Sequence, residues 1–175
     1  MIKKEMVSYC LDTLKKAGAD KAACSMNMME KKELNVEIGE MTLLRTTFNN
    51  NMGISVIKDQ KKGSTSINKT DKDSIDTAVA LVMAMAEGSQ PDEAYDIAEQ
   101  QPSKSFSKGD ESANLDTMYQ SLEEFVDYVK STYPKIQLEA AIMDFNHSRS
   151  FFQNTNGVDI HNGCFQLNFW VRRFY

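Results

Sequence analysis

The sequence predicts an α+β fold built from two units, each combining an amphipathic helix with an antiparallel sheet. Three observations lead to this prediction. Apolar residues recur at helical spacing in three segments, they alternate at a spacing of two in several others, and a polar stretch separates the two halves of the chain. Because both halves begin with a helix and continue with strands, the pattern also suggests an internal duplication.

The first half begins with an amphipathic helix over residues 3–17. Its apolar side chains fall on one helical face, at Val7, Cys10, Leu11, Leu14 and Ala17. Gly18 follows, and glycine readily takes the left-handed conformation that ends many helices. We therefore expect the helix to stop at this glycine.

The chain then changes to the alternation that is typical of half-buried strands. Five short strands are expected, over residues 22–28, 34–38, 42–48, 53–58 and 63–68. The asparagines at 49–51 predict a turn between the third and fourth strands, and Asp59 with Gln60 predicts a hairpin turn between the last two. Gly53 and Gly63 stand where strands begin or bend.

A second amphipathic helix closes the first half. Thr70 is the expected N-cap, because Asp73 follows it at the spacing of a capping box. The helix is expected from about Lys72 to Glu87, with a buried stripe of Ile75, Ala78, Val79, Val82, Met85 and Ala86. Gly88 ends it.

Composition divides the chain into three parts. Residues 89–113 carry two of the three prolines and many polar side chains, so we expect a surface connection with a short helical turn near 92–97. The first helix-and-sheet unit is then residues 1–88, and the second is residues 114–175.

The second unit begins with an amphipathic helix over residues 115–132, which Pro134 closes. Strands follow from residue 136, a turn is expected at Asn156-Gly157, and the last strand covers residues 164–171. Because no element follows to cover this last strand, we expect the unit to be truncated and the edge of the strand to be exposed.

The net charge is −5, which argues against a nucleic-acid-binding protein, since such a protein normally presents a basic face. Lys58, Lys61 and Lys62 cluster, but hairpin tips often carry charge simply to stay solvated. The chain has no long apolar run and no apolar N-terminal segment, so we expect a cytoplasmic protein without a membrane span.

Residues that could carry chemistry are few. Cys10, Cys24 and Cys164 are widely spaced and odd in number, which favours three buried thiols in a reducing compartment over a disulfide framework or a metal site. His147 and His161 fit no metal-ligand spacing and are expected in solvated turns.

Other reactive side chains also lack partners in the sequence. Asp159 and His161 would share a strand face, but no third group completes a site. Glu30, Glu33, Glu123 and Glu124 are interpreted as solvent-facing charges, and the hydroxyls of residues 64–66 as strand residues. No catalytic, cofactor-binding or metal-binding residue is predicted.

Four short motifs resemble, in their order, the N-terminal region of the PmbA/TldD family, also known as DNA gyrase modulator or microcin-maturation proteins. They are Gly18-Ala19-Asp20, Gly53-Ile54-Ser55-Val56, the strand from Gly63 to Asn68, and Asn154-Thr155-Asn156-Gly157. The resemblance covers essentially the whole chain. The first hairpin is poorer in glycine than is usual in the family, which affects the expected geometry of its turn.

The resemblance implies a peptidase context. TldD-type subunits act as zinc metalloproteases through a His-Glu-x-x-x-His helix, while PmbA-type subunits generally lack the metal ligands and pair with the metal-bearing subunit. Family members are longer than 175 residues, and no position of this chain matches the metal motif. Zinc is therefore expected only in a full-length, metal-bearing member.

Two hypotheses from different classes follow. In the first, the chain is a noncatalytic N-terminal domain of a PmbA/TldD-type peptidase, inactive alone, which contributes to subunit assembly and substrate admission. It would join a homo- or hetero-oligomer and bind neither nucleic acid directly nor membranes. In the second, it is a free-standing interaction module that docks on a partner through its exposed edge strand. A self-sufficient hydrolase has the least support.

Overall fold

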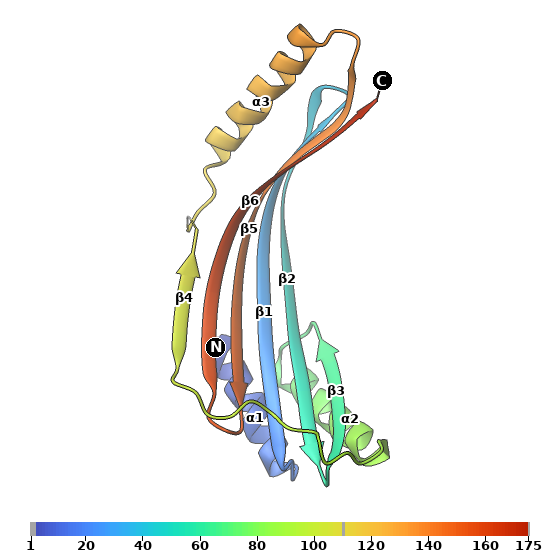
Figure 1. Cartoon of the computed structure of the whole chain (residues 1–175), viewed down its shortest axis with the longest axis vertical. Coiled ribbons are helices and arrows are strands. Elements are labelled where there is room, and N and C mark those ends of the chain that lie inside the picture. The colour runs from blue at the N-terminus through green and yellow to red at the C-terminus, as the bar shows by residue number, and fades with distance from the viewer. Residues whose placement is uncertain (1–2, 110, 175) are drawn as a thin grey trace. The chain divides into compact units, whose positions relative to one another are not determined.

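The structure is a computed structural model that describes residues 3–109 and 111–174, so the residues at the ends of the predicted units, 1–2 and 175, and Asp110 of the predicted connection lie outside it. The described residues form three helices and one six-stranded sheet (Figure 1). In chain order the elements are α1 (Lys3–Lys16), β1 (Lys21–Glu37), β2 (Glu40–Lys58), β3 (Lys61–Ile67), α2 (Lys72–Gly88), β4 (Lys104–Lys108), α3 (Leu115–Thr132), β5 (Gln137–Asn154) and β6 (Asp159–Phe174). The predicted α+β class is confirmed.

The strands lie in the order β3-β2-β1-β5-β6-β4. The chain divides into two compact units that interleave its two halves. The first comprises the described parts of Met1–Met28, Asn49–Phe106 and Arg149–Gly163, and the second those of Met29–Phe48, Ser107–Ser148 and Cys164–Tyr175. Every strand except β3 contributes residues to both units. The boundaries expected from composition, at 88 and 113, remain a prediction.

Two of the predicted strand boundaries are wrong. The expected strands 22–28 and 34–38 are one strand, β1, and the expected strands 42–48 and 53–58 are one strand, β2. The asparagines at 49–51 therefore form no turn. Asparagine disfavours strands only weakly, and main-chain pairing with a neighbouring strand outweighs this preference.

The predicted turn at Asp59-Gln60 is confirmed, and it joins β2 to β3 as an antiparallel pair in which Lys58 faces Lys61. Both turn residues take positive φ angles, 51° and 62°, although neither is glycine. Two successive residues of this kind are typical of the tight turns that match strand twist. A second turn of the same kind, at Ile38 and Gly39, joins β1 to β2.

In the first unit, helices α1 and α2 bury one face of the sheet. The buried side chains of α1, β1, β2 and α2 form a single cluster: Met6, Val7, Cys10, Leu11, Leu14, Ala22, Cys24, Met26, Met52, Ile54, Val56, Ile75, Ala78, Val79, Val82, Met83 and Ala86. The predicted stripe of α2 is correct except at Met85, which is exposed where Met83 is buried. Ala17 lies beyond the end of α1 and is exposed, and Gly18 takes the expected positive φ angle, 87°.

The N-cap of α2 is Asp71 and not the predicted Thr70. The Asp71 carboxylate accepts hydrogen bonds from the main-chain nitrogen and the hydroxyl of Ser74, each at 2.9 Å. A carboxylate at this position satisfies an otherwise unpaired amide and complements the positive end of the helix. These contacts fix where α2 begins.

In the second unit, α3 has the predicted bounds and packs on parts of β1, β5 and β6. The buried residues of this cluster are Leu34, Val36, Met118, Leu122, Val126, Leu138, Ala141, Met143 and Phe145. Phe125 of α3 contacts Phe169 of β6 edge to face, with ring centroids 5.0 Å apart. One helix thus covers this part of the sheet.

The connection at 89–113 contains a strand, β4, which the sequence analysis missed. Ser103 donates to the Asp159 carbonyl at 2.9 Å, and a Cβ added to Gly109 would lie 2.4 Å from the Phe165 carbonyl. Since both contacts join residues 56 apart, β4 runs parallel to β6 (Figure 1). The predicted helical turn at 92–97 is wrong, because Asp92 instead forms a short turn through a hydrogen bond to the Ala94 nitrogen at 2.8 Å.

The structure covers the outer edge of β6 only as far as about Cys164, so the exposed edge expected at residues 164–171 stays a prediction. Strand β6 lies between β5 and β4, so β4 covers the outer edge of its first residues, and the edges of the sheet are β3 and β4. No helix among residues 3–109 and 111–174 is long and apolar enough to cross a membrane.

Candidate functional site

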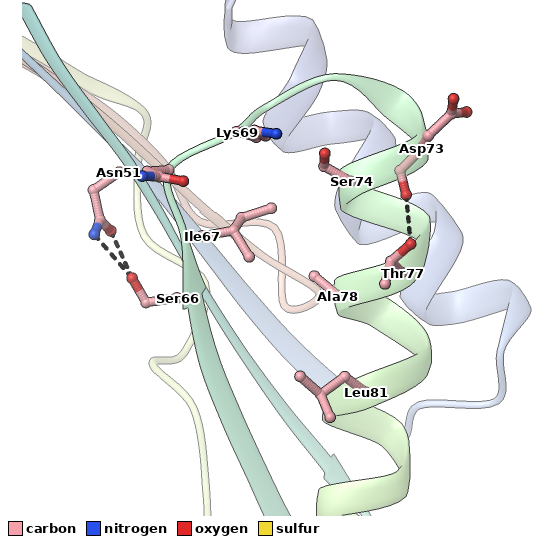
Figure 2. A pocket seen from close by; sticks show the side chains of 10 residues that line it. Asn51, Ser66, Ile67, Lys69, Asp73, Ser74, Thr77, Ala78 and Leu81 are labelled. Atoms are coloured by element: carbon pink, nitrogen blue, oxygen red, sulfur yellow. Dashed lines mark hydrogen bonds between the residues drawn. The ribbon is translucent and has the colours of Figure 1, made fainter.

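A candidate site is an open groove of about 710 Å³ in the first unit, between the end of β3 and the first half of α2 (Figure 2). Its strand side is formed by Asn51, Ser66 and Ile67, followed by Asn68 and Lys69 of the connecting loop. Its helix side is formed by Asp73, Ser74, Thr77, Ala78 and Leu81. This volume lies within the range of sites that hold small ligands or short peptide segments.

Gly63 explains why the groove opens at one end. A Cβ added to Gly63 would lie 2.2 Å from the Val82 carbonyl oxygen and 2.8 Å from the Ala86 nitrogen, so the second half of α2 rests directly on the strand. At the other end of β3, the side chain of Ile67 stands between strand and helix, and Figure 2 shows it pointing toward α2. The helix and strand therefore diverge toward the N-terminal end of α2.

The outer edge of β3 carries main-chain groups that no strand pairs. In an antiparallel pair, alternate residues direct their N–H and C=O groups to the partner strand. Because a two-residue turn makes Lys58 and Lys61 a hydrogen-bonded pair, Lys62, Ser64 and Ser66 direct theirs outward. The Lys62 nitrogen indeed donates outward, to the Ser89 hydroxyl at 3.1 Å.

The start of this edge is covered and the rest is open. Pro91 forms an antiparallel bridge with Lys61, and the Asp92 nitrogen donates to the Gln60 carbonyl at 2.8 Å. β3 is the end strand of the sheet, so within the described chain no strand pairs with the outer edge at Ser64 and Ser66. An open edge of this kind is a template for another strand.

The charges of the groove nearly cancel. Lys69 and Asp73 are the two charged residues of the lining. Beside them, the hydrogen bonds from Ser74, first that of its main-chain nitrogen, hold the pKa of the Asp71 carboxyl below its usual value, so this cap stays ionised. The Ser66 hydroxyl and the Asn51 amide exchange hydrogen bonds of 2.9 and 3.0 Å (Figure 2).

The two histidines lie outside the groove and in strands, not in the turns that the sequence analysis expected. His147 belongs to β5 and stacks on Phe165, with ring centroids 4.3 Å apart. His161 belongs to β6 and lies 6.3 Å from the Phe151 ring. Among the described residues, no group of three or more histidine, cysteine, aspartate or glutamate side chains is placed to hold a metal ion.

Asp159 contributes to a polar network between α1 and the strands. Its carboxylate accepts from the Lys4 ammonium at 2.8 Å and from Gln153 at 3.3 Å, and Gln153 in turn accepts from the Ser8 hydroxyl at 2.9 Å. Lys4 is the main reason why the pKa of Asp159 lies below its usual value, with Gln153 and His161 adding to the effect. The network fixes α1 against β5 and β6.

The cysteines are free thiols. Cys10 and Cys24 are buried side by side in the first core, where contact with Cys10 and burial raise the pKa of the Cys24 thiol strongly. Such a thiol is a poor nucleophile. Cys164 is only half-buried, so the prediction of three buried thiols is correct for two of them.

The second unit contains a buried carboxylate that the sequence analysis expected in solvent. Glu33 is 3% exposed and pairs with Lys31 at 2.5 Å and with Arg45 at 2.7 Å. Burial works to raise the pKa of Glu33, but Lys31, Arg45 and a hydrogen bond from Asn35 outweigh it and keep this pKa low. Asp144, also buried, lies 3.6 Å from Lys31.

The lysines of the β2–β3 hairpin have partners of their own. Lys58 pairs with Glu87 at 3.2 Å, Lys61 donates to the Glu87 carbonyl at 3.0 Å, and Lys62 lies over the Tyr95 ring. These contacts hold the hairpin against the end of α2. They agree with the interpretation of the cluster as an ordinary charged turn.

The sequence analysis singled out no groove residue as a site. The available signal was Gly63 inside a strand, which often marks a close approach of two backbones. The position of α2 over this glycine, and hence the groove beside it, depends on tertiary packing.

Comparison with known proteins connects this fold to a family. Residues 28–86 match the sequence profile of PmbA/TldA metallopeptidase domain 1. No curated protein matches the sequence.

Three solved structures share the fold. TldE from Thermococcus kodakarensis superposes with a TM-score of 0.80 at 16% identity, over 96% of this chain. A proposed modulator of a DNA gyrase from Thermotoga maritima has a TM-score of 0.71 at 11% identity, over 97% of this chain. A proposed modulator of DNA gyrase from Bacteroides thetaiotaomicron has a TM-score of 0.71 at 14% identity, over 96% of this chain.

This chain spans 39% of the length of each of these three proteins. The likeness of fold extends over nearly all of the described residues, and the profile match covers β2, β3 and most of α2, with the groove between them. By this profile match over residues 28–86 and this shared fold, the chain resembles the first domain of the PmbA/TldD family.

Proposed function

We propose that this chain is a noncatalytic N-terminal domain of a PmbA/TldD-type peptidase, with a role in subunit assembly and substrate admission. The observation that carries the proposal is the match of residues 28–86 to a metallopeptidase first domain. The superposition of TldE supports it, since it covers 96% of this chain and 39% of the TldE chain. In this proposal, peptide-bond cleavage belongs to residues outside the present 175.

Exposed apolar side chains of the second unit support the role in assembly. They lie on the outer strands of this part of the sheet, at Leu43, Leu44 and Phe48 of β2 and at Leu167, Phe169, Trp170 and Val171 of β6. Trp170 is 65% exposed. β1 and β5 separate these two strands, so the exposed apolar residues form two stretches. Exposed apolar stretches often mark an interface, and we assign the stretch on β6, which carries Trp170, to contact with a PmbA/TldD-type subunit.

The experiment is a binding titration with a purified, full-length, metal-bearing TldD-type subunit, followed by sedimentation velocity. Wild-type chain is expected to co-sediment with the subunit, and Trp170→Glu to bind at least tenfold more weakly. Tyr119→Glu, on the exposed face of α3, is the matched control and is expected to bind like wild type. Equal binding of all three, or none, contradicts the role in assembly.

The noncatalytic assignment has its own test. The isolated chain is incubated with unfolded casein, with and without a zinc chelator, and cleavage is followed by mass spectrometry. No chelator-sensitive cleavage is expected. Chelator-sensitive hydrolysis by the pure chain would refute the assignment.

A second candidate function is a free-standing interaction module that docks by strand addition. The register of the β2–β3 hairpin favours it. β3 pairs with β2 only from Met52 onward, so within the described residues no strand pairs with Glu40–Asn49 on that side. The outer edge of β6 beyond β4, which the sequence analysis predicted as the docking edge, stays a second candidate for the same contact. If the chain is such a module, its affinity for a TldD-type subunit should not change when the N-terminal domain of that subunit is deleted.

The proposed cellular location is the cytoplasm. Three free cysteines fit a reducing compartment.

A further inference from the structure

We propose that the groove between β3 and α2 binds an extended, uncharged peptide segment, which adds as a strand to the outer edge of β3. This inference concerns the first unit and needs neither the proposed assembly nor a second subunit. It rests on the free main-chain groups of β3, on the apolar floor of the groove and on its charge.

The main chain of β3 supplies the recognition. The N–H and C=O groups of Ser64 and Ser66 point away from β2, at the spacing that another strand requires. Residues 89–92 block the edge at Lys61 and Lys62, so an added strand begins at about Ser64. From there to Lys69 it would span about six residues.

The face of α2 supplies the specificity. Gly63 contacts α2, so Thr65 and Ile67 face the helix as well, and alternate side chains of an added strand would point the same way. There they would meet Ile67, Ala78 and Leu81, of which Leu81 is 52% exposed. Small apolar side chains at alternate positions fit this floor.

The balanced charges of the groove lining favour an uncharged peptide. The groove lining carries one lysine, Lys69, and one aspartate, Asp73, so it offers no net charge to a phosphate or to a nucleic acid. The Thr77 hydroxyl donates a hydrogen bond of 2.8 Å to the Asp73 carbonyl. Asn51, Ser66 and Ser74 also have hydrogen-bond partners within the chain, so the outward main-chain groups of β3 are the main regular row of donors and acceptors for an occupant.

The test uses the full chain and a fluorescein-labelled peptide of about six alternating threonine and valine residues, with blocked ends. Fluorescence anisotropy measures its affinity. The matched control peptide has the same side chains but N-methyl groups on alternate residues, which remove the donors that strand addition requires. The methylated peptide is expected to bind at least tenfold more weakly.

Two pairs of protein variants locate the site. Leu81→Lys is expected to weaken peptide binding at least fivefold, while Met85→Lys, one turn later on α2 and outside the groove lining, is expected to leave it unchanged. Ser64→Pro removes an outward N–H from an edge strand that tolerates proline, and should weaken binding similarly. Ser64→Ala keeps that N–H and should bind like wild type.

Circular dichroism first confirms that each variant is folded. Equal affinity for the two peptides, equal binding by Leu81→Lys and Met85→Lys, or no binding of the unmethylated peptide at millimolar concentration would each overturn the inference. Its failure is distinguishable from failure of the proposed assembly, because the subunit titration varies Trp170 in the second unit and uses no peptide.

Discussion

The two parts of β2 both carry apolar and β-branched residues, but their surroundings differ. From Met52 to Lys58, the apolar side chains Met52, Ile54 and Val56 are buried under α1 and α2 in the first core. From Thr42 to Asn49 every residue is exposed, including Leu44 at 59% and Phe48 at 72%. One continuous strand thus contains a core segment and a segment with almost no burial.

The difference teaches that strand formation and burial are decided separately. Main-chain pairing with neighbouring strands is enough to extend β2 through both parts. Burial needs a covering layer, which α1 and α2 provide for the first unit, whereas in the second unit α3 packs mainly on β1 and β5. Apolar residues of a strand without a cover are available for a partner.

Truncating one side chain in each part of β2 sharpens this comparison most. Ile54→Ala is expected to lower the free energy of unfolding by about 2–5 kcal/mol, because it leaves a cavity in a packed core. Leu44→Ala, in the exposed part, should change it by less than about 0.5 kcal/mol. Urea denaturation followed by circular dichroism measures both, and similar losses for the two variants would contradict the comparison.

The contact of α2 with Gly63 gives the next largest effect. Gly63→Ala places a methyl group against the Val82 carbonyl and the Ala86 nitrogen, so the helix must shift, at a cost of about 1–3 kcal/mol. Gly88→Ala is the control, because nothing lies within 4 Å of the added carbon. Its free energy of unfolding should stay constant or rise by up to about 1 kcal/mol. A Gly63→Ala protein as stable as wild type would show that α2 is not held against this glycine.

Helices were predictable from the sequence to within a residue or two. The stripes of α1, α2 and α3 are local patterns, and their ends carry local signals such as Gly18. The N-cap of α2 was missed by one residue, because Thr70 and Asp71 are both acceptable caps and only the bonds to Ser74 distinguish them.

The lengths of the strands and the groove were not predictable in this way. Whether the asparagines at 49–51 turn or extend depends on pairing with a distant strand, and the same holds for β4, which is a strand only because β6 lies beside it. The groove depends on how α2 sits on Gly63. Each of these features arises from contacts between residues far apart in sequence, which periodicity does not report.

A smaller effect is expected at the buried carboxylate of the second unit. Glu33→Gln leaves Lys31 and Arg45 without their shared carboxylate. The free energy of unfolding should fall by about 1–2 kcal/mol. A larger loss is not expected, because Lys31 and Arg45 are partly exposed and water screens their charges. Glu30→Gln, whose carboxylate lies 3.6 Å from Lys32 and is partly exposed, is the control and should change it by less than about 0.5 kcal/mol. Thermal melts of the three proteins at neutral pH test this, and equal melting temperatures would exclude a stabilising role for the Glu33 pairs.

The cap of α3 should contribute about as much as an average N-cap. The Asn114 side chain accepts a hydrogen bond of 3.0 Å from the Thr117 nitrogen. Asn114→Ala removes this acceptor and should lower the free energy of unfolding by about 1 kcal/mol. Asn114→Ser keeps an acceptor and should recover most of the lost free energy of unfolding. A serine variant as unstable as the alanine variant would show that this hydrogen bond does not stabilise the protein.

The caps of α2 and α3 differ in one respect that pH can expose, since Asp71 titrates and Asn114 does not. The bonds from Ser74 hold the pKa of Asp71 below its usual value of 3.8, so the folded state binds this proton less readily than the unfolded state does. The stabilisation is therefore complete above pH 3.8 and is lost as the pH falls through the lower pKa of the folded state. Asp71→Asn should remove this part of the acid sensitivity, and Asn114→Asp should add a similar part at α3. Denaturation curves across pH 2–6 of both variants and of wild type would separate them, and the same pH dependence in all three would mean that neither cap responds to its charge.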